Sequence, residues 1–201
     1  MSRAIAAIVE GHAEVEAVPL LLRRIFAQLG APEIQVARPF RIKRNRVVKA
    51  GELERAISQT IRDRDGVAGI MVLIDSDDDC PAELGGQLLD RAKKATQLPV
   101  AVVLAHRVFE CWILGSKESL RGINGIAENA TAPLTPENIR GAKEHLTQNM
   151  IRGRRYLAVD DQVRFAEKFD LNLARQRCPS FDKCFREVER LLDTMGTATH
   201  S

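Results

Sequence analysis

Apolar residues in the first half of the chain gather in short unbroken runs separated by longer mixed segments. The unbroken runs cover residues 4–9, 70–74 and 99–104, and such runs are typical of strands that are buried on both faces. A fourth strand is predicted at residues 34–42. Within it, Pro39 indicates an edge position or a bulge, because proline donates no hydrogen bond to a neighbouring strand.

Between these runs, apolar residues recur with the spacing of one helix face. The first stripe covers residues 18–29, and Gly30 follows it where a C-terminal cap glycine belongs. Further helices are predicted at residues 53–61 and 84–95. Alternating strands and helices predict an α/β fold, with a mostly parallel Rossmann-like sheet of about four strands flanked by helices.

The pattern changes after the fourth strand. We expect a helix at residues 109–114, an irregular loop at residues 122–133, and then a helix capped by Thr135 with Pro136 in its first turn. The last helix, with Ser180 as its N-cap, has an apolar stripe suited to packing on the sheet. The predicted division of the chain is an α/β core at residues 1–115, a helical C-terminal extension packed on it at residues 116–195, and a flexible tail at residues 196–201.

Composition favours a soluble protein of the reducing cytoplasm. The 201 residues are 45% hydrophobic and 28% charged, and no apolar run approaches the roughly 20 residues that a membrane helix needs. The apolar run near the start is too short for a secretory signal. Aromatic residues make up only 4%, so we expect an aliphatic core. Four widely spaced cysteines without a CxxC pair are interpreted as free thiols: Cys80, Cys111, Cys178 and Cys184.

Two of the predicted strands end in acidic residues. Glu10 follows the first strand, and Asp75 and Asp77 follow the third. Ligands bind at this carboxyl edge in open parallel sheets, so the three acids converge if the two strands are neighbours. Crowded carboxylates raise one another's pKa unless a cation binds, and oxygen ligands suit Mg²⁺ or Mn²⁺. Glu14, one helical turn beyond Glu10, could supply a further ligand.

A plainer reading exists for some of these acids. An acid after a strand is often a helix N-cap, and an acidic run is usually a solvated turn. The second reading suits Asp78 and Asp79 better than it suits Asp75 and Asp77, which directly end a buried strand.

An apolar strand running into Glu10-Gly11, and another ending in Asp75-x-Asp77, resembles the toprim domain shared by topoisomerases, primases and several nucleases. The segment IVEGHAE at residues 8–14 is most similar to the branch found in overcoming-lysogenization-defect (OLD) nucleases. The whole chain resembles a small stand-alone bacterial family of that branch, catalogued as a domain of unknown function. Three stretches show this likeness: residues 42–53 (IKRNRVVKAGEL), 108–114 (VFECWIL) and 180–191 (SFDKCFREVERL).

The resemblance implies one or two divalent metal ions bound by Glu10, Asp75 and Asp77, with Glu14 as a ligand of the second ion. Glu110, after the fourth strand, would close the site; an exposed helix acid is the alternative. The chemistry implied is phosphodiester cleavage, in which one metal activates water and the other stabilises the leaving oxygen.

Other candidate groups are less specific. Lys183 is the candidate for neutralising phosphate in the transition state, against the alternative of an ordinary exposed lysine. His12 and His106 are interpreted as structural or surface histidines rather than proton shuttles.

A basic stretch without a single acid, residues 38–49, spans the second strand and the loop after it. It could contact several phosphates, with affinity that falls steeply with salt, or it could be a charged strand edge that resists aggregation. The candidate nucleic-acid-binding residues are Arg38, Arg41, Lys43, Arg44, Arg46 and Lys49. A second basic cluster surrounds Gly153: Arg152, Arg154 and Arg155.

The function expected from these features is a metal-dependent nuclease acting on nucleic acid, with DNA favoured, in bacterial genome defence. No GxxxxGK[ST] loop is present, so an ATPase would be a separately encoded partner. The only tyrosine, Tyr156, is far from the motif, which argues against topoisomerase chemistry. The alternatives are a non-catalytic metal-binding module that regulates a partner, and a nucleotide-sugar transferase using the Asp-x-Asp motif. A homo-oligomer is compatible with the sequence.

Overall fold

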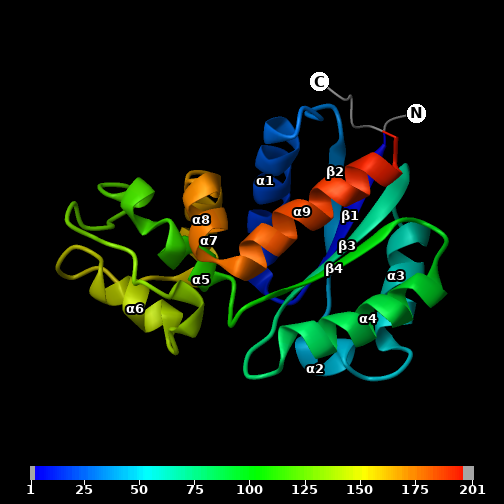
Figure 1. Ribbon diagram of the computed structural model, residues 1–201, viewed down its shortest axis with the longest axis horizontal. Helices are drawn as coiled ribbons and strands as arrows, with labels where there is room; N and C mark the ends of the chain where they lie inside the picture. The colour runs from blue at the N-terminus through cyan, green and yellow to red at the C-terminus, as the bar shows by residue number, and fades with distance from the viewer. Residues whose placement is uncertain (1–2, 197–201) are drawn as a thin grey trace.

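Four parallel strands form the central sheet of the computed structural model, which describes residues 3–196 (Figure 1). Their order across the sheet is β2-β1-β3-β4, and every neighbouring pair is parallel. The strands are β1 (Ala4–Val9), β2 (Gln35–Arg41), β3 (Val67–Asp75) and β4 (Val100–Ala105). The predicted α/β class with a parallel sheet of about four strands is confirmed.

Pro39 lies on an edge strand and beside an irregularity in the strand pairing. Ala6 pairs with Ala37, but Ile8 pairs with Phe40, so β2 contains one residue more than β1 over this stretch. The edge position and the bulge expected for Pro39 are therefore both present. The bulge bends the open edge of the sheet, where a hydrogen-bond donor is not needed.

Helices cover both faces of the sheet (Figure 1). Alternate strand residues point to α1 and α9 on one face, and to α3 and α4 on the other. The helices of the described chain are α1 (His12–Gln28), α2 (Arg44–Val47), α3 (Glu52–Arg62), α4 (Pro81–Ala95), α5 (Glu110–Gly115), α6 (Ala142–Gln148), α7 (Ala158–Ala166), α8 (Leu171–Arg177) and α9 (Pro179–Thr194), with short 3-10 turns η1 (Lys117–Leu120) and η2 (Pro136–Asn138). None of the helices in this part of the chain is both long and apolar enough to cross a membrane.

The C-terminal half departs from prediction at its helix starts. Thr135 and Pro136 begin only a three-residue 3-10 turn, and α6 starts after Gly141. Helices α7 and α8 were not expected, because each is short, with nine and seven residues. The last helix begins earlier than predicted, with Cys178 as N-cap and Pro179 in the first turn.

Ser180 therefore lies inside α9 and is not its N-cap, and its buried side chain makes several hydrogen bonds. Its Oγ accepts hydrogen bonds from Trp112 Nε1 at 2.8 Å and from the backbone N–H of His106 at 3.0 Å. It also donates to a Glu137 carboxylate oxygen. These contacts tie α9 to α5 and to the end of β4.

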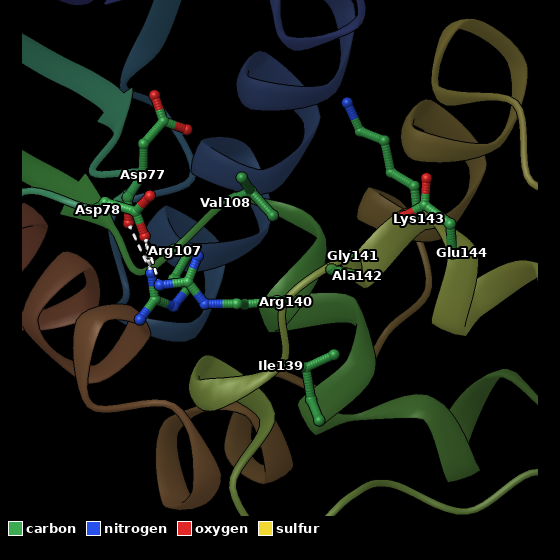
Figure 2. A pocket seen from close by; sticks show the side chains of 10 residues that line it. All are labelled: Asp77, Asp78, Arg107, Val108, Ile139, Arg140, Gly141, Ala142, Lys143 and Glu144. Carbon is green, nitrogen blue, oxygen red and sulfur yellow. Dashed lines mark hydrogen bonds and ion pairs between the residues drawn. The ribbon is translucent and has the colours of Figure 1, made fainter.

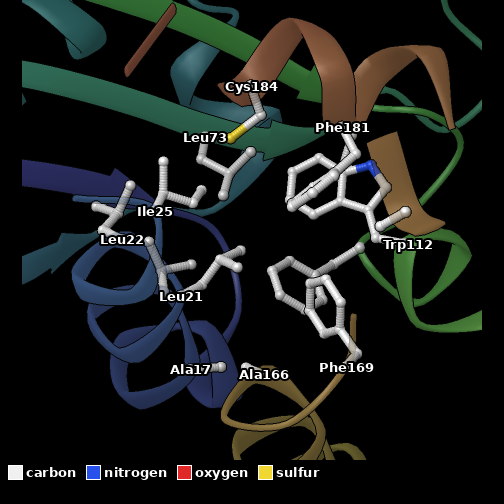
Figure 3. Close-up of a cluster of buried hydrophobic side chains, with 14 of the residues drawn as sticks. Ala17, Leu21, Leu22, Ile25, Leu73, Trp112, Ala166, Phe169, Phe181 and Cys184 are labelled. Carbon is white, nitrogen blue, oxygen red and sulfur yellow. The ribbon is translucent and has the colours of Figure 1, made fainter. Parts of the chain in front are cut away.

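The core is aliphatic on one face of the sheet, and on the other face it combines aliphatic with aromatic side chains. Aliphatic side chains fill the face under α3 and α4, as composition predicts. On the α1 and α9 face, Trp112, Phe169 and Phe181 form a cluster whose neighbouring ring centroids lie 5.1–5.5 Å apart (Figure 3). The few aromatic residues are concentrated where the C-terminal segment meets the sheet, and the core runs without interruption across residue 115. The tail predicted beyond Gly196 lies outside the described residues.

Replacing Phe181 by alanine should lower the free energy of unfolding by about 3–5 kcal/mol, since its ring is fully buried against two aromatic neighbours. Urea titration followed by the fluorescence of Trp112, the only tryptophan, measures this. The control is Val159→Ala, because Val159 is 71% exposed and its truncation should cost less than about 0.5 kcal/mol. Equal losses from the two variants would contradict the packing described.

Candidate active site at the carboxyl edge of the sheet

Strands β1 and β3 are direct neighbours, which is the condition under which their terminal acids converge. Val9 pairs with Leu73, so Glu10, which follows β1, and Asp75, the last residue of β3, lie within one residue of the same level at this edge. The electrostatics agree, because the charges of Glu10, Glu14 and Glu110 all raise the pKa of Asp75. The acids brought together at this edge, called here the acid cluster, are Glu10, Glu14, Asp75, Asp77 and Glu110.

Asp75 lies at the centre of the acid cluster. Its Oδ1 accepts the backbone N–H of Phe109 at 2.9 Å, which fixes the carboxyl group toward the end of β4. Burial, followed by the nearby charges of Glu14 and Glu110, raises the pKa of Asp75 well above its ordinary value, and the bond from Phe109 offsets this only in part.

Glu14 folds back over the start of its own helix. Its Oε2 accepts the backbone N–H groups of Glu10 at 3.0 Å and of Gly11 at 3.1 Å. Burial raises the pKa of Glu14 to about 7, against the effect of these two bonds. A Cβ at position 11 would lie 3.0 Å from Glu14 Oε1. A residue larger than glycine at this position would therefore crowd the Glu14 carboxylate.

Glu10 is half-buried and incompletely bonded. Its Oε2 is buried without a hydrogen-bond partner in the described part of the chain. Burial and the charge of Asp77 raise the pKa of Glu10, while the guanidinium of Arg44 lowers it. A buried carboxylate oxygen without a donor is suited to accept a cation.

Glu110 is buried at the start of α5, so the alternative interpretation of Glu110 as an exposed helix acid is wrong. The hydroxyl of Tyr156 donates to Glu110 Oε1 at 3.1 Å, and Lys143 Nζ lies 3.7 Å from the same oxygen. Burial and the charge of Glu110 raise the pKa of Tyr156 well above its usual range, so the phenol keeps its proton and donates. Tyr156 is distant in sequence, but the fold brings it to the acid cluster.

Arg44 secures the loop that carries Asp77. Its guanidinium donates to the carbonyl oxygens of Asp75 at 3.1 Å and Ser76 at 3.2 Å, approaches Asp77 Oδ2 at 3.5 Å and pairs with Asp79. Asp77 has a φ of +50°, a left-handed conformation that aspartate tolerates better than most residues.

The predicted basic stretch is thus not one free track. Arg44 is committed to the loop, and Arg46 is paired with Glu52, its Nε lying 2.8 Å from a carboxylate oxygen. Arg38, Arg41, Lys43 and Lys49 remain exposed.

A pocket of about 270 Å³ opens beside Asp77 (Figure 2). Three acids line it, Asp77, Asp78 and Glu144, together with the cations Arg107, Arg140 and Lys143. Asp78, which is exposed as expected, pairs with Arg107 and lies 3.0 Å from Arg140. The pocket therefore offers cations within reach of the acid cluster.

Lys183 and the two histidines lie apart from this pocket's lining. Lys183 Nζ is beside Gly85 of α4, so its role in the chemistry stays a prediction. His106 Nδ1 lies 2.9 Å from Ser76 Oγ, and burial lowers its pKa, as does the charge of Arg107. A neutral, hydrogen-bonded His106 fits the structural reading. His12 is exposed at the start of α1.

Sequence reasoning missed four residues of this site. Arg107 follows β4 within two residues, so the strand-end rule that found Asp75 would also have found it. Arg140, Lys143 and Tyr156 come from segments without regular apolar periodicity, so no pattern in the sequence indicated them.

The donor set fits a divalent cation in its chemistry, because it offers several carboxylates and one unpartnered carboxylate oxygen. Within residues 3–196, however, no group of three or more His, Cys, Asp or Glu side chains is arranged to hold a metal ion as it stands. The reason is visible in the bonds: Glu14 and Asp75 each accept backbone donors, and Asp77 faces Arg44. Binding would require side chains to turn.

Comparison with known protein families identifies the family of this chain. The family model described as Domain of unknown function (DUF4276) matches residues 9–189. The chain belongs to this family. The matched span contains the whole acid cluster and the pocket beside it, so the site is part of the family domain. No curated protein and no solved structure matches the chain.

Replacing Glu14 by glutamine should stabilise this DUF4276 protein at pH 8 without metal. The folded state keeps the Glu14 proton up to about pH 7, while an unfolded glutamate releases it near pH 4.5. The contribution of the Glu14 proton to the free energy of unfolding is therefore fully present below about pH 4.5. It falls as pH rises toward 7, by about 3 kcal/mol in all. Urea titrations at pH 5, 6.5 and 8 should show the variant gaining on the wild type as pH rises.

Glutamine keeps an oxygen for the two backbone donors, so the variant should fold. Glu16→Gln, exposed on the same helix, is the control and should follow the wild type at every pH. A Glu14→Gln curve that runs parallel to the wild type would show that Glu14 is not a buried, proton-retaining acid.

Proposed function

We propose that this protein is a toprim-type phosphodiesterase, similar to OLD nucleases, that hydrolyses nucleic acid with Mg²⁺ or Mn²⁺. The observation that carries the proposal is the acid cluster lying against a pocket to which Arg107, Arg140 and Lys143 contribute cations, beside the acids Asp77, Asp78 and Glu144. Carboxylates suit a hard metal ion, and cations suit the phosphate that the metal would act upon. Neither feature alone would distinguish this reaction from simple ion binding.

Each group has a proposed role. Glu10, Asp75 and Asp77 would hold the metal, with Glu14 and Glu110 available for a second ion. When bound, such ions supply activation of water and stabilisation of the leaving oxygen.

The cations of the pocket bind and neutralise the phosphate. Lys143 is better placed for this than Lys183, because its Nζ lies 3.7 Å from Glu110 while Lys183 lies beside Gly85. Arg107 and Arg140 would exchange their contact with Asp78 for the substrate.

The biological setting of the proposal rests on the resemblance. It is that of a nuclease component of bacterial genome defence, in the cytoplasm, acting on DNA and working with a separately encoded ATPase. The cysteines of the described chain are all free thiols, which supports a reducing compartment. Assembly into a homo-oligomer belongs to the same proposal.

One observation favours a second function, a non-catalytic metal-binding module that regulates a partner. Glu14 and Asp75 accept backbone donors and Asp77 faces Arg44, so these acids are not preorganised around a metal. A nucleotide-sugar transferase is less well supported, because an Asp-x-Asp motif does not account for Glu10, Glu14 and Glu110 in the same cluster.

Asp75→Asn should remove both metal binding and cleavage while leaving the fold intact. Asparagine still offers an oxygen to the Phe109 N–H, so only the charge is lost. Mg²⁺ or Mn²⁺ should raise the melting temperature of the wild type but not of the variant. Cleavage of plasmid and linear DNA should fall at least about 100-fold. The matched control is Asp90→Asn, an exposed acid on α4.

The outcomes separate the two functions. Metal-dependent stabilisation without cleavage of DNA or RNA by the wild type would favour the regulatory module. Full metal binding by Asp75→Asn would rule out the acid cluster as the metal site.

Lys143→Ala should lower the rate of cleavage at saturating substrate, with metal-induced stabilisation retained, because Lys143 is assigned to the phosphate and is not one of the proposed metal ligands. Lys183→Ala is the comparison, and we expect it to cleave at close to the wild-type rate. Lys143→Arg should recover part of the activity, since it keeps the charge. The reverse ranking of Lys143 and Lys183 would return the phosphate-binding role to α9.

A further inference from the structure

A second hollow lies at the open edge of β2, next to the start of α1. It has a volume of about 520 Å³ and is lined by His12, Arg38, Arg41 and Arg64. A further hollow of about 360 Å³ shares Arg38 with it and adds Arg23. Together they form a continuous depression along the strand, called here the β2 groove. None of this surface belongs to the acid cluster or to the pocket beside Asp77.

Positive charge dominates the β2 groove. Four arginines and one histidine line it, and Glu16 is the single acid among the lining residues. Arg64 and Arg38 lie close together: Arg64 Nε donates to the backbone oxygen of Arg38, and burial lowers the pKa of Arg64, an effect that the charge of Asp63 opposes and that of Arg38 adds to. Like charges gathered in a concave surface attract an anion.

The groove begins beside the acid cluster. Arg41 pairs in register with Val9, the residue before Glu10, and His12 follows two residues after Glu10. Since β2 lies next to β1, and the pocket of Arg107 and Lys143 lies beyond β3, the acid cluster is flanked by cations on both sides. A chain of phosphates crossing the strand ends would meet cations before and after the acids.

The lining also suits more than a lone phosphate. Pro39 and Phe40 give the groove an apolar floor, and the Arg64 guanidinium lies 5.9 Å from the centre of the Phe40 ring. An elongated basic groove with an apolar floor matches the alternating phosphates and sugars or bases of a nucleic-acid strand.

We propose that the β2 groove binds the phosphate backbone of a single nucleic-acid strand as it leaves the acid cluster. The proposal rests on the proposed function, and it assigns affinity to Arg23, Arg38, Arg41 and Arg64. Arg44 and Arg46 are not assigned phosphate contacts in this proposal, because they are paired with Asp79 and Glu52.

The test is binding of a short labelled single-stranded DNA, followed by fluorescence anisotropy without divalent metal at several salt concentrations. The variant R38A/R41A/R64A should bind at least about tenfold more weakly, and the slope of log affinity against log salt should fall by about 2, as expected for three lost phosphate contacts. The control K93A/K94A/K168A removes the same charge from exposed lysines elsewhere and should leave both quantities nearly unchanged.

Two further variants guard against misfolding. R38E/R41E changes only exposed side chains and should abolish binding while keeping the wild-type melting temperature. Glu16→Gln removes the one acid of the groove and should tighten binding about two- to fivefold, the range of one exposed charge interaction.

Several results would overturn the proposal. One is an unchanged affinity and salt slope in both arginine variants. Another is wild-type affinity with self-association on size-exclusion chromatography, which would assign these arginines to protection of the sheet edge. A third is equal weakening by the lysine control, which would mean that only net charge matters.

Failure of the proposed function gives a different pattern. If the protein binds DNA through the groove but never cleaves it with Mg²⁺ or Mn²⁺, the groove stands and the nuclease does not. If cleavage depends on Asp75 while the arginine variants bind like the wild type, the nuclease stands and the groove does not.

Discussion

Parallel pairing of β1 with β3 is the constraint on which the whole site depends. Because both strands run the same way and lie side by side, the residues that follow them must leave the sheet at one edge. Glu10 and Asp75 are neighbours for that reason alone, although 64 residues separate them in the sequence. Pairing β4 beside β3 then brings Glu110 to the same place.

Gathering acids in this way costs stability, and the structure shows how the cost is limited. Raised pKa values allow Asp75 and Glu14 to keep protons, which removes part of the repulsion. Backbone donors from Gly11 and Phe109, and the guanidinium of Arg44 at the loop, offset more of it. The bonds around the acid cluster thus support a group of side chains that repel one another, as is common at functional sites.

The sequence was informative wherever local pattern decides structure. Apolar runs located the strands, and the acids at their ends followed from the geometry of a parallel sheet. It was uninformative wherever distant segments meet. Arg44 resembled a free base because its partners lie in a loop thirty residues away, and Tyr156 seemed remote because an irregular segment returns it to Glu110. The aromatic residues gave a similar result, since a count cannot show that Trp112 and Phe181 meet.

The hydrogen bond between Tyr156 and Glu110 also has a consequence for how the protein is made. The ribosome releases β1 to β4 first, but the tyrosine that orients Glu110, and the helix α9 that covers the sheet, follow all four strands in the sequence. The acid cluster cannot take its final form until these later segments have been synthesised. A nascent chain that ends before Tyr156 therefore carries the acids without their arrangement, and whatever chemistry they perform begins only after the segment through α9 has folded onto the sheet.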